Sequence, residues 1–506
     1  MKSRIVRFVK RAFRFGLKLS AVLLVAGTVV WVVCTVVLWN QAADLREEFR
    51  AKGYAMSLAE IEPPQVPDRE NAAIDLLKAH RIKVKPRTKP NWEDAVGVLE
   101  YGTAAERKDP TVGKLARTFL VDYAERLALV HQAARKPKMR LPIDYHGSYG
   151  DPVYTSMVDA ENMVRLLESE ALIAAYMNDS KRSIEAMKAM CQLVSLMRQE
   201  PTEAVAFCQR RCANRTVSAF ANVMNLTKLD QAELNIIRVH LDQVEQQALR
   251  PIKEWKSLDT MIREELSTAS SYKGRRELEF FYGAQLLGPP RTWVNLVYDL
   301  AYVLYPTPIG IPIRLTDEMT IRKRVIQQLE AASRPIYMRS DMKPYVRSMS
   351  GDDTGMPQLD VYCVSYYNWF TLTEKAISRE TMRTKMRGED IAAMLEAYRL
   401  KHGAYPGRLW ELSTLGLGAA PPDPFSGKPF HYRKKEGRYL LWSVGPNLVD
   451  DGGIAVNKSS RQEVDILWNT GSPETGINYG YTHPPLVPRP EFSPGPHPPL
   501  PVSRPD

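Results

Sequence analysis

An uninterrupted apolar stretch near the N-terminus constrains this chain more than any other feature. Residues 19–39 (LSAVLLVAGTVVWVVCTVVLW) contain no charged side chain. At about 1.5 Å of rise per residue, a helix of this length crosses the hydrocarbon core of a bilayer, which is roughly 30 Å thick. The sequence therefore predicts a membrane-spanning helix, and Trp31 and Trp39 are suited to the membrane–water interface.

The charges that flank this stretch predict its orientation. Residues 1–18 contain seven Lys or Arg and no Asp or Glu, whereas the residues just after the stretch are nearly balanced in charge. Since a basic flank stays on the cytoplasmic side, we expect a basic cytoplasmic segment at 1–18 and the bulk of the chain in the periplasm. A cleaved signal peptide is the alternative, but the stretch ends in bulky Leu38 and Trp39 where small residues would precede a cleavage site.

The net charge of +11 does not indicate nucleic-acid binding. Most of this charge lies in the first 18 residues, and no basic run with interleaved aromatic residues occurs elsewhere. A basic segment beside a membrane span is typical of contact with anionic lipids. We therefore expect the membrane and envelope proteins as partners, and no nucleic acid.

The middle of the chain carries a helical pattern. Residues 40–67 predict a short juxtamembrane helix that stops at Gly53 and then a proline-containing linker, and Asp68 is a candidate cap for a helix over 70–81. From 68 to 360, apolar residues recur at spacings of three and four in segments with short breaks. This predicts an irregular helical domain of antiparallel neighbours. A helical-hairpin repeat is the alternative, although no regular period of about 34 residues is present.

Three features of this domain are open to two interpretations each. Tyr145, His146, Tyr149 and Asp151 lie in a glycine-containing stretch that either contacts a ligand or only connects two helices. The apolar segment 293–305 is too short to span a bilayer, and it lies either on the membrane surface or in the core.

The third feature is a pair of cysteines. Cys191 and Cys208 are about equally far from a predicted hairpin turn at 199–202, so they form either a disulfide or two buried free thiols. On the preceding predicted helix, Glu161 and Glu168 share a helix face, which we interpret as a solvated face.

Residues 361–483 combine a long helix with a small α+β unit. The stretch 362–402 contains no proline, so we expect one long helix, or two end-to-end helices broken near Gly388. The alternating segments PFHYR and RYLLWS are joined through 434–437 and predict a β-hairpin, with a third strand near 464–468. The fold class predicted for the whole chain is therefore mainly α, with a small C-terminal α+β module.

This C-terminal stretch resembles the C-terminal module of the major pseudopilins of type II secretion systems. The matching motifs are H-G-x-Y-P at 402–406, D-P-F-x-G-x-P-x-x-Y at 423–432 and S-x-G-x-N…D-D-G-G at 443–453. The N-terminal part has neither the Phe-Thr pair nor the glutamate of the G-F-T-x-x-E start of pseudopilins, so we do not expect the chain to polymerise into a fibre. The whole chain is also similar to uncharacterised single-span membrane proteins of planctomycete-type bacteria, with which it shares N-A-A-x-x-L-L at 71–77.

The resemblance implies a calcium site in the final loop, because that loop binds calcium in pseudopilins. By position, Asp450 and Asp451 would supply carboxylate ligands, and backbone carbonyls would complete a shell of oxygen atoms. Asn447 stands where such loops usually have an Asp, which removes one charge from the site. The alternative is an acidic turn held by hydrogen bonds from its own backbone.

The sequence contains none of the common catalytic motifs. We find no H-E-x-x-H, G-x-S-x-G, phosphate-binding loop, G-x-G-x-x-G or C-x-x-C. Residues 484–506 are rich in proline, which predicts a disordered tail. We expect a non-enzymatic, membrane-anchored binding or assembly protein of the cell envelope. The alternatives are an enzyme acting on the cell wall or polysaccharides, with the 145–151 loop in its cleft, and a structural envelope spacer.

Overall fold

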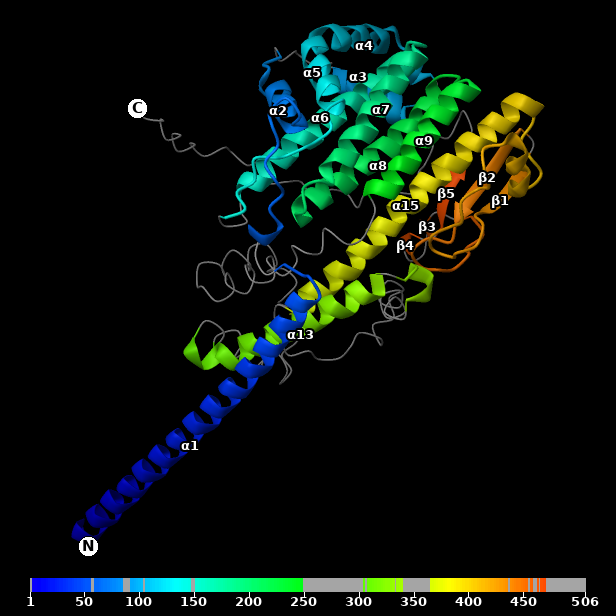
Figure 1. The fold of residues 1–506 in the computed structure, drawn as a ribbon. Helices are drawn as coiled ribbons and strands as arrows, with labels where there is room; N and C mark the ends of the chain where they lie inside the picture. Colours follow the sequence, from blue (N-terminus) through cyan, green and yellow to red (C-terminus); the bar gives the residue numbers. More distant parts are fainter. Residues whose placement is uncertain are drawn as a thin grey trace, which may run out of the picture.

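The computed structural model is mainly helical, with a small antiparallel sheet near the C-terminus (Figure 1). It describes residues 2–55, 59–84, 92–102, 105–146, 151–248, 304, 307–332, 334–339, 365–435, 437–453, 456–457, 462–463 and 465–469. The predicted apolar segment 293–305, apart from Leu304, and the predicted tail lie outside these residues.

The N-terminal helix α1 (Lys2–Ala51) is continuous and contains the predicted span (Figure 1). Its apolar part is long enough to cross a membrane, with a mean hydropathy of 2.7 and no buried residue in the most apolar window. The helix predicted to leave the membrane before Gly53 is the last part of α1, which continues from the apolar stretch to Ala51 without a break. Gly53, with a positive φ of 78°, follows its end as predicted.

Antiparallel helices with short connections form the next part of the chain. They are α2 (Ala72–Arg81), α3 (Trp92–Tyr101), α4 (Pro110–Asp122), α5 (Ala124–Ala134), α6 (Asp151–Tyr176), α7 (Ser180–Met197), α8 (Glu203–Leu226) and α9 (Gln231–Ala248). The helix α6 packs against α2, α3, α7 and α8, so it lies at the centre of this bundle. Its fully buried Leu167 and Leu172 share one core with Leu193 of α7 and Phe220 of α8.

The cap of α2 differs from the predicted one. Asn71 precedes the helix, and its side-chain oxygen accepts the backbone N–H of Ala73 at 3.0 Å. The same amide group donates to the carbonyl of Arg140 at 2.9 Å. Asn71 rather than Asp68 is the cap because the helix begins at Ala72, so Asp68 lies one turn too early to reach its first N–H groups.

Two helices connect the bundle to α1 and to the C-terminal module. The helix α13 (Ile311–Ala332) follows a 3₁₀ turn at Pro308–Gly310 and packs along α1, and a second 3₁₀ turn follows at Ile336–Met338. The helix α15 (Ser365–His402) packs against α8, α9 and α13. In Figure 1, α15 runs from beside α13 to the sheet.

The C-terminal module packs on the last part of α15. Its sheet has the order β1 (His431–Lys435), β2 (Arg438–Ser443), β5 (Ile466–Asn469), all antiparallel, and β3 (Val456–Asn457) pairs with β4 (Gln462–Glu463). The predicted hairpin and third strand are present, and a 3₁₀ helix at Leu409–Leu415 packs between the sheet and α15. The buried Asp423 accepts the Ser443 hydroxyl at 2.7 Å, which joins two of the motifs recognised in the sequence.

Of the two predicted alternatives, the structure has the single long helix, since α15 is unbroken at Gly388. A Cβ atom on Gly388 would lie 2.0 Å from the ring of Trp468 in β5. This tryptophan also donates its indole N–H to Glu389 at 3.0 Å. The glycine is therefore required for close contact between helix and strand, and not for a helix end.

We expect Gly388→Ala to destabilise the protein by about 1–3 kcal/mol through overpacking, even though alanine favours a helix by about 1 kcal/mol. Gly97→Ala in α3 is the matched control, since a Cβ there meets no atom within 4 Å. Thermal melting followed by circular dichroism compares the two variants. A Gly388→Ala midpoint at or above that of Gly97→Ala would contradict the close contact.

Candidate functional site

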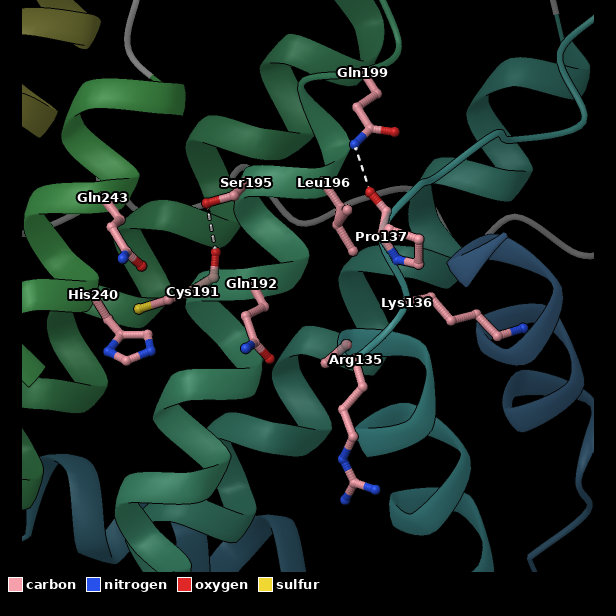
Figure 2. A pocket seen from close by; sticks show the side chains of 11 residues that line it. Arg135, Lys136, Pro137, Cys191, Gln192, Ser195, Leu196, Gln199, His240 and Gln243 are labelled. Carbon is pink, nitrogen blue, oxygen red and sulfur yellow. Dashed lines mark hydrogen bonds between the residues drawn. The ribbon is translucent and has the colours of Figure 1, made fainter. Parts of the chain in front are cut away.

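A pocket of about 320 Å³ opens between the end of α5, the face of α7 and the middle of α9 (Figure 2). Most of its polar lining comes from two helices. Gln192 and Ser195 lie on α7, and Gln199 lies just after its C-terminal end. His240 and Gln243 lie on α9. Residues 134–137 form the rim on the α5 side. Among the described residues, the lining contains no Asp or Glu.

Hydrogen bonds fix part of this lining. Gln199 donates to the Pro137 carbonyl at 3.1 Å and accepts the Met139 N–H at 2.9 Å, so it fastens the rim to the end of α7 (Figure 2). The Nδ1 of His240 lies 2.7 Å from the Ile236 carbonyl. Because a carbonyl only accepts, Nδ1 carries the proton and Nε2 of the neutral ring is an acceptor.

Cys191 also lines the pocket, and its thiol is not activated. Burial raises the pKa of Cys191 to about 12, so the thiol is neutral near pH 7. A nucleophilic cysteine needs its thiolate form. Of the two interpretations of Cys191 and Cys208, the structure has the buried free thiols.

A buried ion-pair cluster lies next to the pocket, on the other side of Gln199. Glu200, whose side chain is fully buried, accepts hydrogen bonds from Arg140 at 3.1 Å, the Tyr145 hydroxyl at 2.6 Å and the Leu141 N–H at 2.5 Å. Arg140 also pairs with Glu62 at 3.1 Å and lies over the Tyr145 ring. We call these residues the Glu200 cluster, and it holds the segment that follows α5 against the α7–α8 turn.

Two of the four predicted loop residues belong to this cluster. Tyr145 is buried, and burial together with Glu200 raises its pKa. His146 is exposed, with Nε2 3.0 Å from a Glu62 oxygen. Tyr149 lies outside the described residues, and Asp151 begins α6 but its side chain is not among those described. The structure therefore places Tyr145 in a packing role and His146 at the surface.

The interpretation of Glu161 and Glu168 as a solvated face was wrong. Both side chains are mostly buried between α6 and α8, where Glu168 pairs with Arg215 at 3.0 Å and Glu161 with Arg211 at 2.9 Å. Burial, and then the nearby charge of Glu100, raises the pKa of Glu168 to about 7. Helical periodicity gives the shared face, but it does not show that α8 covers this face.

The predicted calcium residues shape the loop through hydrogen bonds. Asp450 accepts the Trp442 indole N–H at 2.9 Å, which lowers its pKa, and Asp451 accepts the Asn447 amide at 2.8 Å. Asp465, which the sequence analysis did not single out, accepts the Gly453 N–H at 2.7 Å. Within the described part of the chain, no three His, Cys, Asp or Glu side chains are grouped as metal ligands.

Calcium binding by this loop stays a prediction. A cation that binds the folded state raises the melting midpoint by mass action. The prediction requires a higher midpoint in calcium than in chelator, and loss of that difference in Asp451→Asn but not in Asp44→Asn, an exposed position on α1. Equal midpoints for the unaltered protein would remove the site.

Comparison of the chain with protein-family models, curated proteins and solved structures found no match. The resemblance to pseudopilins therefore stays a prediction that rests on the motifs quoted above.

Proposed function

We propose that this protein is a membrane-anchored binding and assembly protein of the cell envelope, without catalytic activity, whose folded part lies outside the cytoplasm. The observation that carries the proposal is the chemistry of the pocket. Its described lining offers amides, a hydroxyl and an imidazole, with Arg135 and Lys136 at the rim, no carboxylate and no activated thiol. Such a lining suits hydrogen bonding to a polar ligand better than acid–base chemistry.

The size of the pocket indicates what it holds. At about 320 Å³ it lies at the small end of the range for ligand sites. Glutamine amides both donate and accept, which matches the alternating donors and acceptors of a peptide backbone or of sugar hydroxyls. The proposed occupant is a short segment of an envelope protein, and the polymer of the envelope is the alternative.

The C-terminal module supplies a second surface for the proposed assembly role. Trp410 in the 3₁₀ helix is 66% exposed, although the same helix buries Leu412 completely. Exposed tryptophan is enriched at the centres of protein interfaces. A pseudopilin-like module presenting this side chain supports partner contact, and the resemblance suggests an assembly related to secretion.

One observation favours the alternative of an enzyme acting on the cell wall or polysaccharides. The pKa of Glu168, about 7, is suitable for a general acid. However, Glu168 is 4% exposed and paired with Arg215, so a substrate does not reach it in this conformation. Binding is therefore the better supported function.

Affinity purification of the full chain from its native membrane tests the proposal. Gln243→Trp fills the pocket from an exposed position, and Gln231→Trp makes the same change at the start of α9, away from the pocket. We expect a stoichiometric protein partner with the unaltered chain and with Gln231→Trp, and its loss with Gln243→Trp. A chain recovered alone in all three cases would contradict the proposal and favour screening of envelope polysaccharides.

A further inference from the structure

One face of α1 is covered along a length that begins inside its apolar stretch. The residues of this face are less exposed than their neighbours and recur at spacings of four and three: Trp31, Thr35, Leu38, Ala42, Leu45 and Phe49. The helix that packs along this part of α1 is α13 (Figure 1). Its contact with α1 therefore starts within the segment that has the length and polarity of a membrane span.

A hydrogen bond fixes the depth of this contact. The indole N–H of Trp31 donates to the carbonyl of Ile309 at 3.1 Å. Trp31 lies eight residues before Trp39, the last residue of the apolar stretch, which is about 12 Å along a helix axis. If the span is 19–39, the turn that contains Ile309 is inside the outer half of the hydrocarbon core.

The backbone of this turn has partners without water. The 3₁₀ turn satisfies the Gly310 N–H with the Thr307 carbonyl at 3.0 Å, and Arg314 donates to the same carbonyl at 3.1 Å. Pro308 and Pro312 have no N–H group, so they remove two donors at the start of a helix, where donors lack intrahelical partners. Backbone groups at membrane depth must be satisfied in this way.

The side chains of residues 308–318 change from apolar to charged at the level where the apolar stretch of α1 ends. The sequence from Pro308 to Ile313 is entirely apolar, and Ile309 is 60% exposed. The first strong ion pair between the two helices, Arg46 with Glu318 at 2.6 Å, lies beyond the apolar stretch of α1. In a membrane-spanning α1, an exposed isoleucine at this level would face acyl chains rather than water.

We propose that residues 308–313 insert into the outer leaflet beside α1 and form a second membrane contact whose partner is the lipid acyl chains. This inference rests on the proposed membrane span of α1. It explains why Ile309 is exposed while the polar groups of its turn are satisfied internally. It also fixes the domain close to the membrane surface at two points, through α1 and through α13.

Depth-dependent fluorescence quenching of the full chain in phosphatidylcholine nanodiscs tests this insertion. The cysteine of Ile309→Cys carries an environment-sensitive dye, in a chain with Cys34 and Cys363 replaced by alanine and with Cys191, Cys208 and Cys212 buried. Val33→Cys on the exposed face of α1 is the reference inside the span, and Met338→Cys, 63% exposed beyond α13, is the reference outside. The quenchers are a nitroxide on the acyl chain and aqueous iodide.

We expect acyl-chain quenching at position 309 to match that at position 33 and to exceed that at position 338 about threefold, with the reverse order for iodide. If position 33 is quenched from the lipid and position 309 only by iodide, the insertion is overturned while the span stands. If neither is quenched from the lipid, the proposed span and the insertion both fail.

Discussion

Replacing Glu200 with glutamine is expected to lower the free energy of unfolding by about 3 kcal/mol, because it removes one partner of a buried ion pair. The glutamine has the same shape, so the loss comes from the Arg140 guanidinium, which keeps only the partly exposed Glu62 as a charged partner. Urea denaturation followed by circular dichroism measures the change. Glu185→Gln on α7 is the control, since that side chain is 64% exposed and its replacement costs less than about 0.5 kcal/mol.

A double variant separates charge from packing in the Glu200 cluster. In Arg140→Met with Glu200→Leu no buried charge is left unpaired, so this variant should be more stable than Glu200→Gln alone. If Glu200→Gln melts like the control, the cluster does not hold the segment that carries the pocket rim.

The second large effect is a pH dependence that originates at Glu168. Its pKa is about 7 in the folded protein and near 4.5 when unfolded. Below pH 4.5 the Glu168 carboxyl is protonated in both the folded and the unfolded state, so the burial of this group does not lower the stability. As the pH rises to about 7, Glu168 releases its proton first in the unfolded state. The free energy of unfolding therefore falls by about 1.4 kcal/mol per pH unit, or roughly 3 kcal/mol in total.

Glu168→Gln should remove most of this loss between pH 4.5 and 7. The slope that remains is expected to come from Glu100, Glu200 and Asp390, whose pKa values are also raised by burial. Denaturation at several pH values compares the variant with the unaltered protein. Parallel curves for the two proteins would contradict the burial of an ionisable Glu168 between α6 and α8.

Local patterns predicted most of the helices and strands because their signals lie within the elements themselves. The apolar stretch of α1, the proline-free run of α15 and the alternation in β1 and β2 each need only neighbouring residues. The role of Gly388 could not be predicted from its neighbours, because the ring of Trp468 that requires a glycine there lies 80 residues further along the chain. Glu161 and Glu168 were misread because periodicity does not show which helix covers a face.

The pocket could not be predicted from the sequence. Gln192, Gln243 and the rim at 134–137 belong to separate segments, and none of them stands in a recognisable motif. The loop at 145–151, which the sequence indicated as a possible ligand contact, contributes Tyr145 and His146 to the Glu200 cluster instead. A weak signal was present in the turn at 199–202, since Gln199 contacts the rim and Glu200 organises the cluster.

We propose that α1 anchors a folded domain outside the cytoplasm, and cysteine accessibility on the two sides of the membrane distinguishes this orientation from the reverse. Ser3→Cys marks the basic N-terminal segment, and Arg117→Cys marks an exposed position on α4, both in the chain without Cys34 and Cys363. In intact spheroplasts, we predict that a membrane-impermeant maleimide labels Arg117→Cys, and that Ser3→Cys is labelled only after the membrane is permeabilised. Labelling of Ser3→Cys alone in intact spheroplasts would contradict this orientation, and with it the proposed role in the envelope.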